Sequence, residues 1–174
     1  MSQIAQILEY NKKFVADKEY EKYSATKFPD KKIAIVSCMD ARLTELLPAA
    51  LGLRNGDAKI IKNAGAMITH PYGSGMRSLL VAVWALGVEE ILVIGHKDCG
   101  MQDFDARKII PAAALDAVEK SGIDVDRWLK GFASVEDSVR DTTGIIRNHP
   151  LMPKDITVYG FVIDPATGAL DQIV

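Results

Sequence analysis

The sequence contains no long apolar run. No stretch reaches the roughly 18 apolar residues that a membrane span requires. Charged residues such as Glu9, Lys12 and Asp17 stand near the start of the chain, where a secretory signal peptide would need an apolar segment. We therefore expect a cytoplasmic protein that has no membrane partner.

An excess of positive charge is also missing. The formal net charge is -2 at pH 7, and no long run of lysine or arginine occurs. Proteins that bind nucleic acids or anionic membrane surfaces usually carry basic patches or basic runs. The composition therefore disfavours both classes of partner.

Cysteine and histidine are scarce, with two cysteines and three histidines among 174 residues. The cytoplasm keeps thiols reduced, so two cysteines there indicate metal binding or catalysis more than a disulfide. Cys38 and Cys99 are therefore candidate functional residues.

What the chain does contain is the pattern of an α/β protein. Hydrophobic residues make up 48% and charged residues 25% of the sequence, and this length suffices for one substantial core, so we expect a single domain over residues 1–174. Apolar runs typical of buried strands alternate with helical patterns, which predicts a mainly parallel sheet flanked by helices. The expected strands are 33–37, 58–62, 91–94 and 156–163, and the expected helices are 44–51, 74–87, 111–120, 126–130 and one opened by a capping box at 134–137. A short turn at 164–168 then predicts that residues 169–174 return as an antiparallel edge strand.

The first 30 residues are expected to form an N-terminal helical arm. Residues 2–16 fit an amphipathic helix with Ser2 as its N-cap. The apolar stripe of this helix either packs on its own domain or extends to a neighbouring subunit, and the sequence leaves both open. The helix at 74–87 is apolar nearly all round, so we expect it to be buried on two sides, by the sheet and by something else such as a subunit interface. Trp84 and Trp128 are interpreted most simply as core residues.

A histidine and a cysteine follow one of the expected strands. After the apolar residues 91–94, Gly95 frees the backbone, and His96 and Cys99 come next. Cys38 closes the expected strand 33–37 in the same way. The carboxyl ends of parallel strands meet at one edge of a sheet, where the connecting loops build the ligand site. Cys38, His96 and Cys99 are therefore expected to converge as metal ligands.

Two thiolates and one imidazole suit Zn²⁺, because sulfur and nitrogen ligands in tetrahedral geometry are its usual set. Three protein ligands leave one position open, and a catalytic zinc keeps that position for water, whose pKa it lowers toward neutrality. Two thiolates neutralise the formal charge of the ion and weaken its pull on the water. We therefore expect an activity that depends on a metal-bound hydroxide and rises with pH on the alkaline side of neutrality.

Asp40 and Arg42 lie two and four residues beyond Cys38. A carboxylate beside a zinc-bound hydroxide can accept its proton in a hydrogen bond and so orient a lone pair at the substrate. An arginine can hold that carboxylate in a two-point clamp and keep it ionised. Alternatively, the carboxylate can swing onto the zinc as a fourth ligand and switch the site off, and the sequence leaves the resting state open.

Each of these residues has a simpler interpretation when it is taken alone. A single cysteine at a strand end is usually a small buried hydrophobe, and Asp40 with Arg42 would form a surface ion pair. Gly65, after the strand 58–62, suits either a close approach of the backbone to a ligand or a plain tight turn. The joint occurrence of two cysteines and a well-spaced histidine favours the metal site.

Three blocks of the sequence resemble the β-class carbonic anhydrases, in particular their compact prokaryotic branch. The blocks are Cys38-Met39-Asp40-Ala41-Arg42, Lys62-Asn63-Ala64-Gly65 and His96-Lys97-Asp98-Cys99-Gly100-Met101. Their order and spacing fit, and the resemblance extends from about residue 33 to residue 174. One departure is Lys97, where the family often has Thr or Ser, and its ammonium would add positive charge near the mouth of the site.

The resemblance implies reversible hydration of carbon dioxide to bicarbonate and a proton, with one zinc ion per chain held by Cys38, His96 and Cys99. It also implies that Asp40 and Arg42 form the catalytic dyad and that the backbone near Gly65 borders the substrate pocket. Members of the family are homodimers or assemblies of dimers, in which the N-terminal helix lies on the neighbouring subunit.

Two alternatives stay open. The same zinc site in related folds is thought to hydrolyse carbonyl sulfide or carbon disulfide, which are linear, apolar triatomic molecules like carbon dioxide. A non-catalytic zinc-binding or redox-responsive module is the second alternative, in which Cys38 and Cys99 form a disulfide after metal loss. The presence of Asp40 and Arg42 disfavours that second alternative, because such a module would not need an activating carboxylate with its own clamp.

Overall fold

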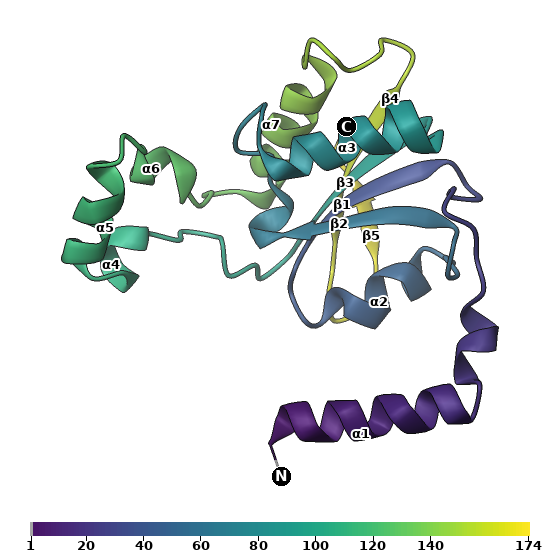
Figure 1. The fold of residues 1–174 in the computed structure, drawn as a ribbon. Helices are drawn as coiled ribbons and strands as arrows, with labels where there is room; N and C mark the ends of the chain where they lie inside the picture. The colour runs from purple at the N-terminus through teal and green to yellow at the C-terminus, as the bar shows by residue number, and fades with distance from the viewer. Residues whose placement is uncertain (1) are drawn as a thin grey trace.

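The computed structural model describes residues 2–174, which form a five-stranded sheet with helices on both faces (Figure 1). The strands are β1 (Ile33–Cys38), β2 (Ala58–Asn63), β3 (Glu90–His96), β4 (Thr157–Ile163) and β5 (Leu170–Gln172). The α-helices are α1 (Gln3–Ala16), α2 (Leu43–Ala50), α3 (Ser74–Leu86), α4 (Ala106–Ile109), α5 (Ala112–Glu119), α6 (Val125–Trp128) and α7 (Val135–Arg147), and two 3-10 turns are η1 (Glu19–Tyr23) and η2 (Ala64–Ala66).

The strand order in the sheet is β2-β1-β3-β4-β5. The first four strands run parallel to their neighbours, and β5 pairs antiparallel with β4. The predicted parallel sheet with an antiparallel edge strand is therefore confirmed. β1 lies between β2 and β3, so the loops that follow these three strands emerge together at one edge of the sheet.

Alternate residues of each central strand face two separate apolar layers. Ala34 and Val36 of β1 pack with α3 and α7 on one face, where buried residues such as Leu79 and Val139 complete the layer. Ile35 points to the opposite face and packs with the buried side of α2. This alternation follows from the two-residue period of a strand and explains why the central strand β1 carries apolar residues on both faces.

Helix α7 approaches the sheet closely because β3 and β4 carry glycine beneath it. A Cβ atom at Gly95 would lie 2.6 Å from Cγ2 of Val135 and 2.9 Å from Cγ2 of Val139. Ser134 caps the helix, with its Oγ accepting a hydrogen bond from the backbone N–H of Asp137 at 3.2 Å. The capping residue predicted at position 134 is thus confirmed, and Gly95 has a packing reason in addition to its place before His96.

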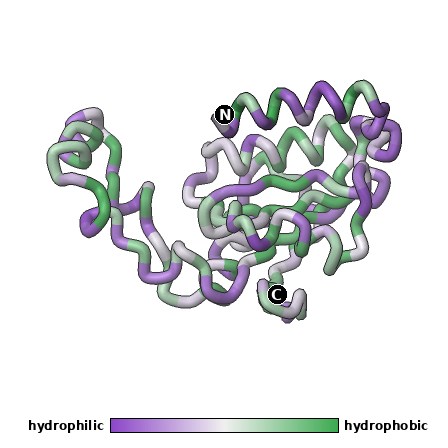
Figure 2. Tube along the Cα trace, turned by 90° about the horizontal axis from the view of Figure 1, so that it is seen from below, coloured by the Kyte–Doolittle hydropathy of each residue, from purple (hydrophilic) through white to green (hydrophobic). Residues whose placement is uncertain are grey.

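Helix α1 contacts the neighbouring 3-10 turn η1, where the ring of Phe14 lies 6.2 Å from that of Tyr23, but it buries none of its residues. Ser2 caps it as predicted, with Oγ accepting from the N–H of Ala5 at 3.2 Å. Figure 1 shows α1 separated from the sheet, and Figure 2 shows hydrophobic and hydrophilic residues alternating along it. Its apolar side chains, among them Ile4 at 66% and Leu8 at 58% exposure, therefore face outward from this chain.

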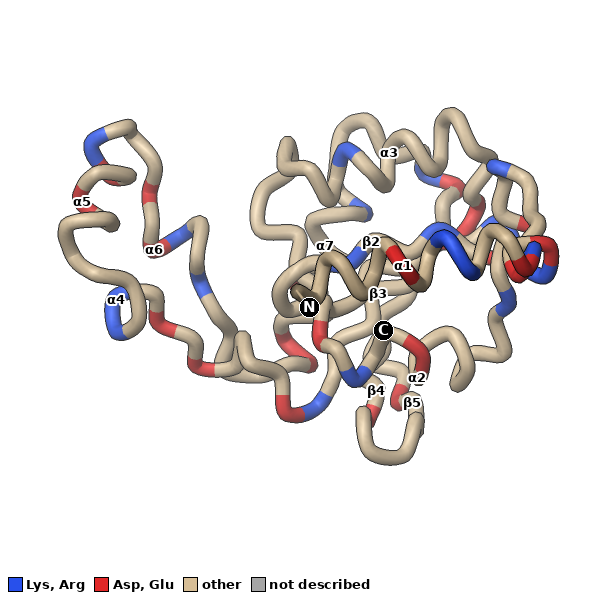
Figure 3. The backbone as a smooth tube through the Cα atoms, turned by 60° about the horizontal axis from the view of Figure 1, so that its bottom comes forward, with Lys and Arg blue, Asp and Glu red and all other residues tan. Residues whose placement is uncertain are grey.

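A second projection is the lobe formed by α4, α5 and α6, which stands away from the sheet in Figure 1. The guanidinium of Arg107 in α4 joins the other two helices of the lobe through Glu119 at 2.6 Å and Asp126 at 2.8 Å. Acidic and basic residues are interspersed over the lobe and the body (Figure 3), so neither presents one dominant sign of charge.

The predictions that Trp84 and Trp128 are core residues are wrong. The side chain of Trp84 sits on the outer side of α3 and is 69% exposed, with Nε1 donating to the carbonyl of Leu151, and Trp128 is 57% exposed. The buried residues of α3, such as Met76 and Leu79, pack in the layer between this helix and the sheet, and the expectation of a second covering surface stays a prediction. Among residues 2–174, no helix combines the length and the apolar character that a membrane crossing takes.

Candidate metal centre

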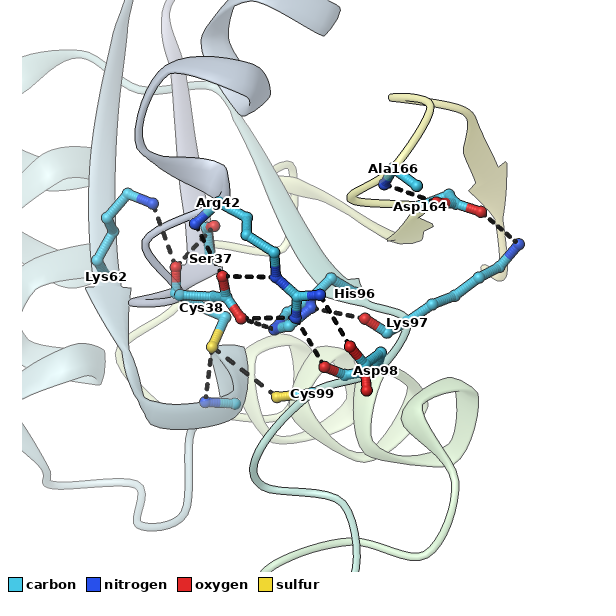
Figure 4. Close-up of polar contacts among 12 residues, drawn as sticks. Ser37, Cys38, Arg42, Lys62, His96, Lys97, Asp98, Cys99, Asp164 and Ala166 are labelled. Atoms are coloured by element: carbon cyan, nitrogen blue, oxygen red, sulfur yellow. Dashed lines mark hydrogen bonds and ion pairs between the residues drawn. The ribbon is translucent and has the colours of Figure 1, made fainter.

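The three predicted ligands converge at the carboxyl edge of the sheet. Cys38 is the last residue of β1, His96 is the last residue of β3, and Cys99 lies in the turn just beyond it. One ligand atom from each lies within 4.8 Å of the other two, and all three residues are buried. Figure 4 shows the two sulfur atoms and the imidazole gathered at this edge.

The donor set fits a zinc ion. Two sulfurs that each lie about 2.3 Å from a tetrahedral zinc are about 3.8 Å apart, and the Sγ atoms of Cys38 and Cys99 are separated by 3.9 Å. Nδ1 of His96 lies 2.8 Å from the carbonyl oxygen of Lys97. Because a carbonyl can only accept, Nδ1 carries the proton and the lone pair of Nε2 is free.

His96 Nε2 is also an orphaned atom. It is buried and has no hydrogen-bond partner among the described residues, and Oδ2 of Asp40 is the nearest carboxylate oxygen at 3.8 Å. Buried polar atoms are nearly always satisfied, so an orphaned one beside two thiols points to a ligand that the site is built to hold. A metal ligated by Nε2 satisfies it.

The two thiols have different acidities. Burial is the largest influence on Cys38 and favours its neutral thiol, but the neighbouring imidazole of His96 and the backbone N–H groups of Asp40 and Gly65 together outweigh burial and lower its pKa. Burial raises the pKa of Cys99, and the neighbouring Cys38 adds to that rise. Cys38 is thus the first thiolate, and a dication would favour ionisation of both, because metals bind thiolate rather than thiol.

Gly65 contributes its backbone to this centre. It has a φ of +78°, and its N–H donates to Sγ of Cys38 at 3.4 Å. A Cβ atom there would meet Sδ of Met67 at 3.0 Å and Cγ of Met101 at 3.1 Å. Glycine is therefore required both by the backbone conformation and by the space, and its amide helps to hold the Cys38 thiolate.

Asp40 and Arg42 form the clamp that their spacing predicts. Nε of Arg42 donates to Oδ1 of Asp40 at 3.0 Å and Nη2 donates to Oδ2 at 2.8 Å, while the backbone N–H of Arg42 also reaches Oδ1 at 2.8 Å. The side-chain hydrogen bond from Arg42 lowers the pKa of Asp40 to about 2, against the opposing effect of burial. The carboxylate is thus ionised at neutral pH and lies beside the ligand cluster.

The side chain of Lys97 lies away from the ligands. Its Nζ is 3.6 Å from Oδ2 of Asp164 and 3.8 Å from Oδ2 of Asp171, and Figure 4 shows it extended toward the β4–β5 turn. The expectation that this ammonium adds positive charge near the mouth of the site is therefore wrong, because two carboxylates at the edge of the sheet attract it elsewhere. Lys97 contributes to the site only through its backbone carbonyl oxygen, which accepts a hydrogen bond from Nδ1 of His96.

Asp98 is a site neighbour that sequence reasoning did not single out. Its Oδ2 accepts from Nη1 of Arg42 at 2.8 Å, and its carbonyl oxygen accepts from Nη2 of Arg42 at 2.8 Å. The available signal was its place in the sequence, since Asp98 is an acidic residue between two expected ligands, His96 and Cys99, at the same sheet edge as Arg42.

Comparisons with known proteins agree with this geometry. A family model described as carbonic anhydrase matches residues 33–170, and the putative carbonic anhydrase YtiB of Bacillus subtilis is 54% identical over 182 residues, covering 100% of this chain and 97% of YtiB. The chain belongs to the β-carbonic anhydrase family. Among solved structures of this family, the β-carbonic anhydrase TvaCA1 of Trichomonas vaginalis matches with a TM-score of 0.84 and 34% identity, covering 100% of this chain and 98% of TvaCA1.

A relative with a different named activity matches as well. The carbon disulfide hydrolase of Acidithiobacillus thiooxidans is 29% identical over 157 residues, covering 81% of this β-carbonic anhydrase family member and 76% of the hydrolase. Membership of the family therefore supports an enzymatic role, and Cys38, His96 and Cys99 form a cluster that could bind a metal ion. The reaction and its substrate are argued separately.

Proposed function

We propose that this protein catalyses the reversible hydration of carbon dioxide to bicarbonate and a proton, with one zinc ion per chain held by Cys38, His96 and Cys99. The observation that carries the proposal is the ionised carboxylate of Asp40, clamped by Arg42 beside a buried donor set that fits zinc. A zinc site with a purely structural role would gain nothing from such a clamped carboxylate.

When bound, zinc supplies Lewis acidity that lowers the pKa of water toward neutrality. The chain itself orients the reaction. Oδ2 of Asp40, 3.8 Å from Nε2 of His96, is placed to accept a hydrogen bond from the attacking water and to direct its lone pair at carbon dioxide. Arg42 keeps Asp40 ionised and oriented, so that the carboxylate stays an acceptor throughout the neutral and alkaline range.

Gly65 has a second role in the proposal. Its N–H is committed to Cys38, and the side chains of Met67 and Met101 lie close to it, so that the surroundings of this backbone are apolar and its own donor is already used. We assign the backbone at Gly65 to the border of the substrate pocket, where a small, apolar, linear molecule needs close approach and no strong hydrogen-bond donor.

Asp40→Asn tests the proposed role of the carboxylate. Asparagine keeps the size of the side chain and one carbonyl acceptor but removes the charge, so we expect the hydration rate to fall about a hundredfold or more with zinc content unchanged. Stopped-flow hydration assays on protein of measured zinc content give the comparison. Full activity in the zinc-loaded variant would contradict the role proposed for the carboxylate of Asp40.

The hydrolysis of carbon disulfide or carbonyl sulfide is the second candidate, and the similarity to the Acidithiobacillus thiooxidans enzyme favours it. Both substrates are linear triatomic molecules, so the same metal centre serves either, and the shape of the pocket decides. The two activities are measured on one zinc-loaded preparation. Turnover of carbon disulfide without hydration of carbon dioxide would show that the protein is a carbon disulfide hydrolase and would refute the proposed carbonic anhydrase activity.

We further propose that the protein is a cytoplasmic homodimer, or an assembly of dimers, in which α1 lies on the neighbouring subunit. The support is the outward-facing apolar side of α1, which buries nothing in its own chain, together with the exposed apolar side chains on the outer side of α3. Helices with such faces need a covering surface. A reducing cytoplasm also keeps Cys38 and Cys99 available as ligands.

A further inference from the structure

The guanidinium of Arg42 binds two acidic residues, which lie in the loops that follow two different strands. On one side, Nε and Nη2 bind the carboxylate of Asp40. On the other side, Nη1 binds Oδ2 of Asp98 at 2.8 Å, and Nη2 also binds the carbonyl oxygen of Asp98 at 2.8 Å. Figure 4 shows the guanidinium of Arg42 joined by dashed lines to Asp98.

The backbone at Asp98 is shaped to present both acceptors. Its φ of +54° places it in the left-handed region, which non-glycine residues occupy seldom and which aspartate and asparagine tolerate best. This conformation turns the carbonyl of Asp98 toward Arg42 while His96 and Cys99, on either side, face the ligand cluster. The turn therefore links the metal ligands of β3 to the clamp that follows β1.

Asp98 itself does not reach the ligand cluster. Its side chain is 85% exposed. Among the hydrogen bonds of the described residues, none joins the side chain of Asp98 to Cys38, Cys99 or His96. Whatever Asp98 contributes to the reaction must therefore act through Arg42. Since Arg42 in turn binds both oxygens of Asp40, a continuous chain of hydrogen bonds joins Asp98 to that carboxylate.

We propose that Asp98 is a positioning residue, which anchors Arg42 from the far side so that Arg42 aims Asp40 at the ligand cluster. This inference rests on the proposed function, because it assigns a role within the same reaction. Without the anchor, the guanidinium keeps Asp40 as its only acidic side-chain partner and can rotate with it. The carboxylate then spends less time in the orienting position.

Two variants distinguish the contribution of the Asp98 side chain from that of its backbone carbonyl. Asp98→Gly removes the carboxylate but accepts the left-handed conformation, so the carbonyl that binds Arg42 is retained. Asp98→Asn accepts the same conformation and keeps one side-chain oxygen that can accept from Nη1. We expect kcat of Asp98→Gly to fall about fivefold to tenfold, and kcat of Asp98→Asn to stay within about twofold of the parent, with KM and zinc content little changed in both.

A double-mutant cycle shows whether the effect passes through Arg42. In an Arg42→Gln background, the clamp is already lost, so Asp98→Gly is expected to cause no further loss of kcat. A loss in that background equal to the loss in the parent would overturn the proposal, because Asp98 would then act independently. A parent-like kcat for Asp98→Gly would overturn it as well.

Crystal structures of the zinc-loaded parent and of zinc-loaded Asp98→Gly give a readout that does not depend on activity. We expect the side chain of Arg42 to leave its single position in the variant, and the carboxylate of Asp40 to move with it. An Arg42 unchanged in the variant would refute the positioning role even if the parent proves inactive toward carbon dioxide. Inactivity of the parent would refute the proposed function alone, so the two failures are distinguishable.

Discussion

The Sγ atoms of Cys38 and Cys99 lie 3.9 Å apart although 61 positions separate the two residues in the chain. β1 and β3 are adjacent and parallel, so their carboxyl ends bring both thiols to one edge together with His96. A zinc ion bound by the folded chain and not by the unfolded chain stabilises the fold by mass action.

Zinc is therefore expected to raise the melting temperature of the metal-free parent, with one ion bound per chain. Cys99→Ser removes a thiolate ligand and should abolish most of that rise. Lys97→Thr is the matched control, because the Lys97 side chain pairs with Asp164 and Asp171 and should leave the rise intact. Calorimetry and metal analysis measure both quantities, and an undiminished rise in Cys99→Ser would exclude Cys99 as a ligand.

The acidity of Asp40 gives a second prediction. Arg42 lowers the pKa of Asp40 to about 2, from an ordinary value of 3.8. A folded-state pKa below the unfolded value means that the pair stabilises the fold above about pH 4, and this contribution is lost as the pH falls toward 2. In carboxyl-carbon NMR titrations of the metal-free protein, Asp40 should remain ionised at about pH 3.

Arg42→Gln provides the comparison for that titration. Loss of the guanidinium should move the midpoint of Asp40 up toward its ordinary value near 4. Equal midpoints in the parent and in Arg42→Gln would contradict the clamp, whatever the activity of either protein.

Gly65 is expected to tolerate no side chain. Gly65→Ala combines a left-handed φ of +78° with close contacts to Met67 and Met101, so we expect a loss of about 2–3 kcal/mol in the free energy of unfolding. Gly52→Ala is the control, since Gly52 has a φ of +62° but no atom within 4 Å of where its Cβ would lie, and should cost about 1 kcal/mol. Denaturant unfolding measures both, and equal losses would show that the space around Gly65 is not restrictive.

The apolar side of α1 predicts the assembly state. Leu8→Glu places a charge on this exposed apolar side, and we expect it to shift the protein toward monomer in sedimentation velocity while leaving the fold of residues 33–174 intact. Gln6→Glu adds the same charge, but at helical spacing Gln6 lies on the other side of α1 from Leu8. Dissociation by both variants, or by neither, would argue against α1 as the interface.

Much of the fold follows from local patterns in the sequence. The four parallel strands are apolar runs bounded by turn residues, and the caps at Ser2 and Ser134 mark two helix starts. The antiparallel return to β5 follows from the short turn after Asp164. These features depend on neighbours in the sequence, and the structure places them within one or two residues of the predicted bounds.

The features that sequence reasoning missed depend on distant partners. The turn η1 and the short helix α4 lie in segments without a strong apolar period. The direction of Lys97 is set by Asp164 and Asp171, far along the chain, and the exposure of Trp84 depends on what covers α3. The contact between Asp98 and Arg42 likewise joins the loops that follow two different strands, so no local sequence pattern predicts it.

The most direct test of the central claim is the hydration of carbon dioxide followed by stopped flow during zinc titration of the metal-free protein. We predict activity that increases in proportion to bound zinc, saturates at one ion per chain, and rises with pH on the alkaline side of neutrality. Stoichiometric zinc binding with no hydration at any pH in that range would contradict the assignment of this site to carbon dioxide.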